Sequence, residues 1–479
     1  MPADAAAPQD PRRFLILAIC CLSLFVVGID TTAVNVALPS IRSDLGTSLA
    51  QLQWTIDAYT LTLASLLLLA GATADRLGRA RIFKLGLALF TLGSLLCSLA
   101  PSAALLIAAR VLQAIGGSML NPVAMSIVRN TFTDARERAQ AIGVWGGTIG
   151  VSMALGPVLG GLLVEAVGWR AIFWVNVPIG IAAIVLTARF VPESRAGRAR
   201  RPDPFGQALV IVLLGTLTFA IIEAPSHGWL SGASVALFGV AAVALAVLVR
   251  WELRRRDPLI EMRFFRSVPF SGATAIAVAA FAGLGGFLFL NTLYLQEARG
   301  LSPLTAGLWT LPMAALTVVC GPLSGRLVGR VGARPSLVIG GAAMTAAGLL
   351  LTELTSTTAI WQLFGAYMLF GLGFGFVNPP ITNTAVSGMP ADQAGVAAAI
   401  ASTSRQIGAT LGVAVVGAVA IPAATFAQAA DVASAGHVGW WIVAGCGALV
   451  FTLGLATTSR WAEGTAARTA LALRGGATT

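Results

Sequence analysis

The chain has 479 residues, of which 57% are hydrophobic and only 11% charged. Soluble domains carry about twice that share of charged residues, so the composition excludes an ordinary soluble enzyme or binding module. The formal net charge of +11 would suit a nucleic-acid-binding protein only if the basic residues formed one surface patch.

Apolar stretches of roughly 20 residues recur along most of the chain, which is the length that a helix needs to cross a bilayer. The alternating pattern of a membrane barrel is absent, and helices are the other way to satisfy backbone groups in lipid. We therefore expect an all-α membrane protein with 14 transmembrane helices. The predicted spans are 14–38, 50–71, 82–100, 102–128, 139–164, 169–190, 205–223, 232–250, 270–296, 303–325, 335–354, 359–386, 394–420 and 438–459.

The basic residues follow this topology. With both termini assigned to the cytoplasm, nearly all of the 31 Lys and Arg residues fall on inner segments. The exceptions are Arg42, Arg170 and Arg299 outside, and Arg110 and Arg405 within spans. This asymmetry is the positive-inside rule, so the positive charge reflects membrane orientation and no nucleic-acid partner is expected.

Each of the first two spans contains a carboxylate. Asp30 lies toward the outer end of the first span, and Asp57 lies between Trp54 and Tyr59 in "LQWTIDAYTLTLASLLLLAG" (52–71). A carboxylate inside a bilayer costs a few kcal/mol or more, so it marks a candidate functional site. We predict that Asp57 binds a proton or a cation, with a structural hydrogen bond as the alternative. Trp54 and Tyr59 are predicted to line a cavity, with ordinary aromatic side chains at the membrane interface as the alternative. For Asp30, a structural pairing with a neighbouring helix is an alternative of equal weight.

The segment after the second span, "GATADRLGRAR" (71–81), combines small and charged residues. Gly71 allows close approach of two helices, and Asp75 is predicted at a helix N-terminus, where anions are favoured. Its arginines face the cytoplasm, and plain positive-inside anchoring is an alternative explanation for them. The further candidates of this segment are Arg76, Gly78 and Arg79.

Polar residues of the fourth span share one face. At about 100° per residue, Gln113 and Asn121 lie within about 60° of Arg110. An intramembrane arginine with polar neighbours on one stripe should face water or another polar group rather than lipid. A structural arginine that binds backbone carbonyls is the alternative. In the thirteenth span, Arg405 is the buried charge of the second half, and functional and structural roles are equally weighted.

The fifth span contains "GPVLGG" (156–161). Its glycines thin the helix, and its proline removes a backbone donor and favours a bend. We predict a hinge or a seal rather than a ligand site, formed by Gly156, Pro157, Gly160 and Gly161.

The chain contains an internal repeat with an insertion. "RVLQAIGGSMLNP" (110–122) aligns with "YMLFGLGFGFVNP" (367–379) at a constant offset, so spans 1–6 repeat as spans 9–14. We expect a six-helix bundle at 1–192, inserted spans 7 and 8 with basic linkers at 193–266, a second six-helix bundle at 267–460 and a cytoplasmic tail at 461–479. Within the second linker, 250–266, a short interfacial helix and an irregular basic linker are equally weighted.

No catalytic or metal-binding pattern is present in the sequence. The P-loop, HExxH and nucleophile-elbow motifs are absent, and the five cysteines fall in apolar spans without ligand spacing. We therefore expect no enzyme activity, no metal and no cofactor, and no ATP drive encoded in this chain.

Four motifs resemble those of one family. "DTTAVNVALPSI" (30–41), "GATADRLGRAR", "RVLQAIGGS" (110–118) and "GPVLGG" occur in the order and span positions of the fourteen-span drug:proton antiporters of the major facilitator superfamily. This resemblance covers roughly residues 12–460. It implies a part in proton coupling for Arg110, a latch across the cytoplasmic gate for Asp75, and an antiporter-type fifth span.

The resemblance implies a secondary exporter in a bacterial cytoplasmic membrane, which works by alternating access and uses the proton gradient as its energy source. "WTIDAY" around Asp57 resembles members that handle lipophilic cations, so hydrophobic cationic drugs are the expected substrates. The expected partners are this substrate, protons and membrane lipid, and one chain should suffice as a monomer. Export of an endogenous metabolite or self-made antibiotic stays open, as does a non-exporting scaffold or a facilitator.

Overall fold

The structure is a computed structural model that describes residues 12–195, 203–255, 258–387, 389, 393–420 and 429–475. Within these ranges all regular secondary structure is helical. The first part of the chain forms α1 (Arg13–Leu45), α2 (Leu49–Leu77), α3 (Arg79–Ser98), α4 (Ala103–Thr131), α5 (Ala135–Ala166), α6 (Ala171–Trp174) and α7 (Asn176–Phe190), followed by α8 (Pro204–His227) and α9 (Gly232–Glu252). The rest forms η1 (Met262–Arg266), α10 (Val268–Leu293), η2 (Tyr294–Ala298), α11 (Pro303–Trp309), α12 (Leu311–Val331), α13 (Ala333–Leu351), α14 (Ile360–Val386), α15 (Ala394–Ala420), α16 (Ala429–Thr457) and α17 (Arg460–Gly475).

The helices lie where the apolar stretches predict them. Thirteen helical stretches of the described chain are long and apolar enough to cross a membrane, with α6–α7, α10–η2 and α11–α12 each counted as one stretch. The remaining predicted span corresponds to α15, which has 27 residues but carries Arg405 and Gln406. These polar side chains lower its mean hydropathy, so α15 is less apolar than the thirteen stretches above.

Local sequence signals set several helix ends. Ser48 and Gln51 form a capping box at the start of α2, in which each side chain accepts a hydrogen bond from the other residue's backbone N–H. Gly46 ends α1 in the left-handed conformation, with φ +61°. Only two residues after Gly46 separate α1 from α2, so these helices form a tight hairpin.

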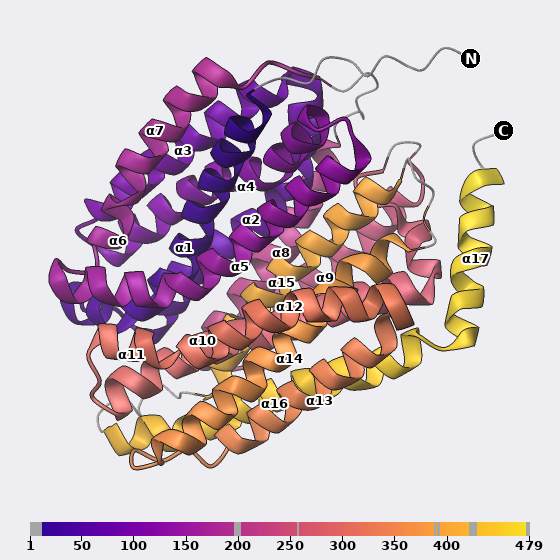
Figure 1. The fold of residues 1–479 in the computed structure, drawn as a ribbon. Coiled ribbons are helices and arrows are strands. Elements are labelled where there is room, and N and C mark those ends of the chain that lie inside the picture. The colour runs from indigo at the N-terminus through magenta and orange to yellow at the C-terminus, as the bar shows by residue number, and fades with distance from the viewer. Residues whose placement is uncertain are drawn as a thin grey trace, which may run out of the picture.

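Two groups of helices pack among themselves. In the first, α1 packs on α5, and α4 packs on both α2 and α3. In the second, α10 packs on α15, and α13 packs on α14 and α16 (Figure 1). Glycines allow the closest approaches: a Cβ atom on Gly93 of α3 would lie 2.7 Å from the Cβ atom of Gln113 on α4.

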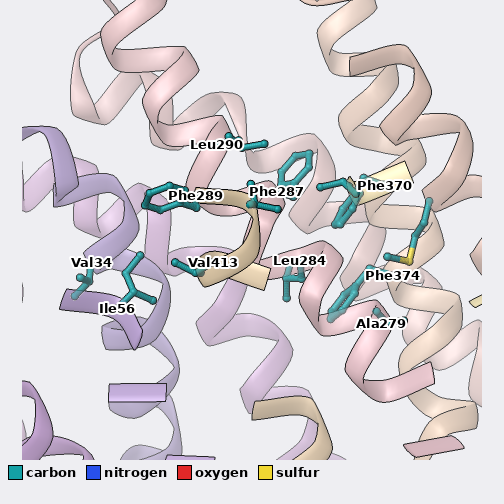
Figure 2. Close-up of a cluster of buried hydrophobic side chains, with 14 of the residues drawn as sticks. Val34, Ile56, Ala279, Leu284, Phe287, Phe289, Leu290, Phe370, Phe374 and Val413 are labelled. Atoms are coloured by element: carbon teal, nitrogen blue, oxygen red, sulfur yellow. The ribbon is translucent and has the colours of Figure 1, made fainter. Parts of the chain in front are cut away.

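One apolar cluster joins the two groups. Val34 of α1 and Ile56 of α2 belong to the same buried cluster as Phe289 of α10 and Val413 of α15 (Figure 2). Deeper in the second group, the rings of Phe287 and Phe370 stack with centroids 4.4 Å apart, and other aromatic side chains surround them. Burial of this continuous apolar surface holds the two groups together in this conformation.

The inserted helices α8 and α9 pack on each other, and α8 also packs on α2 and α15. Two hydrogen bonds fix α8 to α2: Gln207 Nε2 donates to the carbonyl of Ser65 at 2.5 Å, and Trp54 Nε1 donates to Glu223 Oε1 at 3.2 Å. The inserted hairpin therefore lies along the line where α2 meets α15.

The linker and the tail differ from the sequence expectation in detail. In the described part of 250–266, the segment after α9 contains only the five-residue 3₁₀ helix η1, so the interfacial α-helix is not formed there. The tail, in contrast, contains the 16-residue helix α17. Thr465 of α17 accepts a hydrogen bond from the backbone N–H of Val268 at 2.9 Å, so the tail helix caps the start of α10.

Candidate functional site

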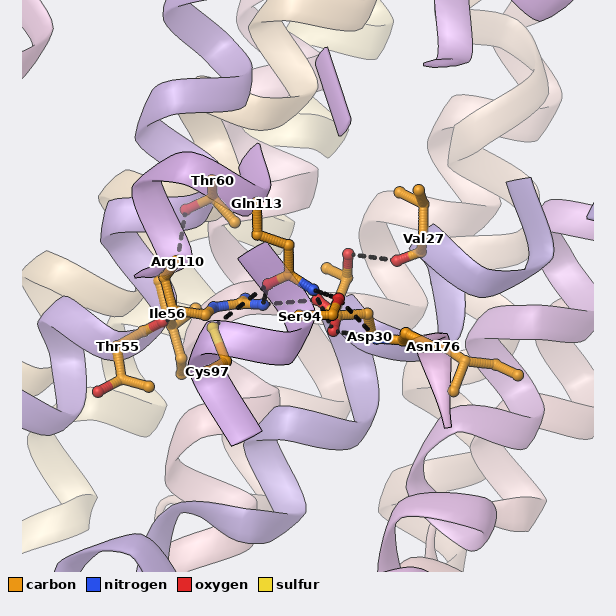
Figure 3. A network of polar contacts seen from close by, with 12 residues as sticks. Val27, Asp30, Thr55, Ile56, Thr60, Ser94, Cys97, Arg110, Gln113 and Asn176 are labelled. Carbon is orange, nitrogen blue, oxygen red and sulfur yellow. Dashed lines mark hydrogen bonds and ion pairs between the residues drawn. The ribbon is translucent and has the colours of Figure 1, made fainter. Parts of the chain in front are cut away.

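A buried ion pair lies at the centre of the first helix group. Arg110 Nη1 of α4 lies 2.5 Å from Asp30 Oδ2 of α1, and the two side chains are 1% and 0% exposed (Figure 3). Arg110 Nε donates to the carbonyl of Thr55 on α2 at 3.1 Å. Its guanidinium carbon lies 4.1 Å from the ring centroid of Tyr59, a cation–π contact. The charge of Arg110 is thus neutralised, and its Nε and Nη1 donors have partners.

Amide and hydroxyl groups complete this network. Gln113 Nε2 donates to Asp30 Oδ1 at 2.8 Å and to Ser94 Oγ of α3 at 2.7 Å, while Asn176 Nδ2 of α7 donates to Asp30 Oδ1 at 2.9 Å. Residues from α4 and α7 therefore hold the carboxylate of α1, and α2 and α3 join the same network through Arg110 and Gln113. Breaking such a buried pair by removing one partner is costly, because the other charge stays buried. Sequence reasoning placed Arg110 and Gln113 on one face but missed Ser94 and Asn176.

The second helix group has a neutral counterpart. Tyr367 of α14 stands at the position that the repeat pairs with Arg110, and it is also fully buried. Its hydroxyl forms a hydrogen bond with Asn291 Oδ1 of α10. The first half therefore carries an ion pair where the second half carries an uncharged pair.

Asp57 lies outside the ion-pair network. It is 0% exposed, and its hydrogen-bond partner is Thr60 Oγ1, 3.5 Å from Asp57 Oδ1. Asp57 Oδ2 is buried without any partner among the described residues. An unpaired buried carboxylate is costly while it is charged, so this site favours the uptake of a proton or of a cationic ligand.

The helix face that carries Asp57 contacts the second helix group. Thr410 Oγ1 of α15 donates to Thr60 Oγ1 at 2.8 Å. One turn before Asp57, Gln53 Nε2 donates to the carbonyls of Val413 and Ala414 at 3.2 and 3.1 Å. Gly417 leaves room for this amide, since a Cβ atom there would overlap it. Asp57 therefore sits at the contact between the two halves.

Three further candidates lie in different surroundings. Trp54 packs against α8, with its ring centroid 5.8 Å from that of Phe219. Tyr59 is fully buried against Arg110, and its hydroxyl has no hydrogen-bond partner in the described chain. Asn121, about three turns beyond Arg110 on α4, likewise has a buried Oδ1 atom without a hydrogen-bond partner among the described residues. Asp57 is thus separated from the aromatic side chains that flank it in sequence.

The expectation for Asp75 at a helix N-terminus is wrong. Helix α2 continues to Leu77, so Asp75 lies in its last turn and binds Arg79, with Oδ1 and Nη2 2.9 Å apart. Glu193 occupies the N-terminus of α3 instead and accepts hydrogen bonds from the backbone N–H groups of residues 80 and 81 at 3.0 and 3.2 Å. Gly78 joins the helices at φ +115°, where a Cβ atom would lie 2.6 Å from this carboxylate.

The other residues of the 71–81 segment have ordinary surroundings. A Cβ atom on Gly71 would lie 3.6 Å from the Cβ atom of Pro122, which is normal contact between α2 and α4. Arg76 is exposed in the last turn of α2. Neither position shows a specific ligand geometry.

The glycines of α5 allow contacts with helices of both halves. Gly156 and Gly160 face Thr32 and Ala33 of α1, and a Cβ atom on Gly161 would overlap the backbone of Pro303. Conversely, a Cβ atom on Gly307 would overlap the carbonyl of Pro157. We name this region, where α5 and the end of α1 contact η2 and α11, the sealed end of the molecule.

Charged and polar groups also close the sealed end. Arg42 of α1 forms an ion pair with Glu297 of η2, with Nη1 and Oε2 3.1 Å apart. Gln296 Nε2 donates to the carbonyl of Val36 at 2.8 Å, and the backbone N–H of Leu304 donates to Glu165 Oε2 at 3.2 Å. The halves are therefore joined firmly where α1 ends and α11 begins.

Replacing Gly161 with Leu should force the sealed end apart, because the added side chain cannot fit against the backbone of Pro303. Spin labels at Val167 and Leu308 should then report longer distances than in the native protein. Gly147→Leu on the same helix is the control, since nothing lies within 4 Å of its Cβ position. Unchanged distances in Gly161→Leu would contradict the seal.

An apolar groove opens near the other end of α1 and α5. It has a volume of about 460 Å³ and is lined by apolar side chains that include Phe14, Phe25 and Val144. Phe14 and Val144 are strongly exposed. The groove offers an apolar surface on the first half, away from the sealed end.

Arg405 of α15 is set apart from the other buried charges. Its Nη2 atom donates to Thr382 Oγ1 of α14, and its guanidinium carbon lies 5.9 Å from the ring centroid of Phe281. Its Nε atom is buried and has no acceptor in the described chain.

Comparisons with known proteins agree with this architecture. Residues 20–413 match the model of the Major Facilitator Superfamily. Multidrug resistance protein Stp of Mycobacterium tuberculosis (strain ATCC 25618 / H37Rv) is 39% identical over 411 residues, which cover 86% of this chain and 76% of Stp. The methylenomycin A resistance protein of Streptomyces coelicolor is 37% identical over 393 residues, 82% of each chain.

A solved structure is similar in fold. The auto-inhibited POT family peptide transporter gives a TM-score of 0.71 at 16% identity and covers 94% of this chain and 98% of its own. At that identity the likeness concerns the fold alone. From the family match and the relatives above 30% identity, the chain belongs to the major facilitator superfamily, in which it is related to multidrug and antibiotic resistance proteins.

Proposed function

We propose that the protein is a proton-driven exporter of hydrophobic, cationic drug-like compounds that works by alternating access in the bacterial cytoplasmic membrane. The observation that carries the proposal is Asp57, a fully buried carboxylate at the contact between the two halves that has no cationic partner among the described residues. The relatives support the export of drugs: they include Stp and LfrA of Mycolicibacterium smegmatis, which is named a multidrug efflux pump.

The proposed topology has fourteen spans and cytoplasmic termini. Helix α15 serves as the remaining span because it packs between α10 and α2, both of which are long apolar helices. The excess of Lys and Arg on alternate loops supports the orientation, which puts the sealed end outside. The bundles at 1–192 and 267–460, the insertion at 193–266 and the tail at 461–479 then form one complete pathway in a monomer.

Asp57 provides competition between proton and substrate. A proton or a cation can neutralise this carboxylate, but the two cannot do so together. Because Thr60 links Asp57 to Thr410, the group that occupies the carboxylate also acts on the contact between α2 and α15. Proton entry from outside would displace the cation there, which is the exchange that an antiporter needs.

Asp30 does not supply a second free acid in this scheme. Arg110 neutralises it, and Gln113 and Asn176 donate to it. One proton should therefore exchange for one monovalent cation, and the exchange should move no net charge. In this scheme Arg110 supports coupling by holding α1, α2 and α4 together around the site.

The relatives support a hydrophobic, drug-like substrate, since they include a multidrug resistance protein and a multidrug efflux pump. An antibiotic is the second candidate substrate. It is favoured by the two Streptomyces relatives, which are named for resistance to methylenomycin A and for tetracenomycin C resistance and export.

Proteoliposomes with an acidic lumen, a lumenal pH dye and external ethidium test the proposal. One-for-one exchange should accumulate ethidium about tenfold per unit of pH difference, which corresponds to about 1.4 kcal/mol. A potential imposed with potassium and valinomycin should leave this ratio unchanged. Ethidium uptake without proton release would contradict antiport, a ratio that follows the potential would contradict the one-proton scheme, and no uptake would contradict the cationic assignment.

A further inference from the structure

Arg405 is a buried cation whose hydrogen-bonding capacity is largely unused. A guanidinium carries five N–H donors and no acceptor. Among the described residues, a hydrogen bond from Nη2 to the hydroxyl of Thr382 uses one of them, and the Nε donor is buried without an acceptor. No ion pair to Arg405 occurs among the described residues. An uncompensated charge at this depth is costly.

Arg110 shows what a satisfied buried arginine looks like in the same protein. It has a carboxylate, a carbonyl, an amide oxygen and an aromatic ring around its guanidinium. Arg405 has a hydroxyl and a ring in those places but no anion. The difference leaves Arg405 without a counter-charge among the described residues.

The surroundings suit an organic anion with an apolar body. The rings of Phe281 and Phe374 form an edge-to-face pair with centroids 5.1 Å apart, and Phe281 also faces the guanidinium. Arg405, Phe281 and Thr382 are each partly exposed as whole residues, although the Nε atom of Arg405 is buried. Planar guanidinium groups bind carboxylates through two parallel hydrogen bonds, which fits this combination of free donors and aromatic walls.

The position along α15 separates this place from Asp57. Arg405 precedes Thr410 by five residues, or roughly 8 Å along the helix, in the direction away from the sealed end. Asp57 precedes Thr60 on the antiparallel helix α2, so it lies on the sealed-end side of the same contact. The two uncompensated charges therefore have opposite signs and occupy different levels of the α2–α15 contact.

We propose that Arg405, Phe281 and Thr382 form a subsite that binds the carboxylate of an apolar or aromatic substrate. The subsite rests on the proposed export function and extends its substrate class: a compound with both an amine and a carboxylate can engage Asp57 and Arg405, and an apolar acid can engage Arg405 alone. Cationic compounds without an acid use Asp57 only.

Binding of 2-naphthoate and of its uncharged amide to the purified protein, measured by calorimetry in the same detergent, tests the subsite. The native protein should bind the acid at least tenfold more tightly than the amide. Arg405→Gln should bring the two affinities within about twofold of each other, and Arg405→Lys should keep part of the preference, because it keeps the charge but loses the planar donors. Arg330→Gln, on an exposed arginine of α12, is the matched control.

Two results would overturn the subsite: equal binding of acid and amide by the native protein, or a preference for the acid that survives in Arg405→Gln. Size-exclusion profiles and unfolding temperatures establish that the variants are folded. Thr382→Val is a second variant that keeps the charge of Arg405, and it should bind the acid more weakly than the native protein does. The binding assay needs neither a membrane nor a gradient. Failure of ethidium–proton exchange would thus refute the export scheme but not the binding of acids at the subsite. Absence of acid binding would refute the subsite but not the ethidium–proton exchange.

Discussion

Arg110→Leu is expected to abolish transport and to destabilise the fold by about 3–5 kcal/mol, which is the usual cost of removing one partner of a buried ion pair. The substitution leaves the 0% exposed Asp30 without a cation, with the amides of Gln113 and Asn176 as its remaining donors, so the carboxylate must stay charged at a high cost or take up a proton. The measurements are thermal unfolding of the purified protein and ethidium exchange in proteoliposomes.

The double variant Asp30→Asn/Arg110→Leu separates stability from transport. Removing both charges should recover much of the lost unfolding free energy, because no buried charge then lacks a partner. The difference between the double variant and the sum of the single variants measures the coupling of the pair. Arg330→Leu, at an exposed site of the same residue type, is the control. An Arg110→Leu protein that unfolds at the native temperature would contradict the role assigned to the pair.

Asp57→Asn is expected to eliminate proton-driven accumulation. Asparagine has the size of the protonated acid but can neither release a proton nor attract a cation, so the accumulation ratio should fall from about tenfold per pH unit to one. The fold should persist, because Asp57 makes no ion pair and its hydrogen bond to Thr60 is long, at 3.5 Å. Ethidium uptake and lumenal pH, followed in the same vesicles, provide the measurement.

Glu353→Gln is the matched control for Asp57→Asn, because it removes an exposed carboxylate from a loop of the second half. Full accumulation by Asp57→Asn would show that the carboxylate is structural. A variant that still exchanges protons but no longer moves ethidium would restrict Asp57 to binding the cationic group of the substrate. The proton site would then have to lie elsewhere.

The positions of the helices follow from the sequence, because an apolar stretch near 20 residues in length is typical of a membrane-spanning helix. The joint location of Arg110 and Gln113 follows equally well, since both lie on one helix with known periodicity. The partners of Asp30 do not follow, because Arg110, Gln113 and Asn176 come from α4 and α7, whose order around α1 no local pattern encodes. The sequence predicts which side chains need partners but not which partners they find.

The misplacement of Asp75 has a local cause. The motif contains two glycines, and a helix break at the first of them would place Asp75 at the start of the next helix. In the structure α2 continues past Asp75, and the second glycine, Gly78, makes the turn. Glu193, which takes over the helix N-terminus, is 113 residues away from Ala80 in sequence. Only the return of the chain after α7 brings it there, so no signal near residues 71–81 could identify it.

The attachment of α8 to α2 makes the two lateral boundaries between the halves unequal. Gln207 and Glu223 hold α8 along α2, and α8 also packs on α15, so the hairpin screens that boundary from the acyl chains. The opposite boundary, between α5 and the α11–α12 pair, has no such cover from the inserted hairpin. Under the proposed export function, a compound dissolved in the bilayer would reach the contact between the halves from the α5–α12 side, beyond the sealed end, because the inserted helices cover the other side.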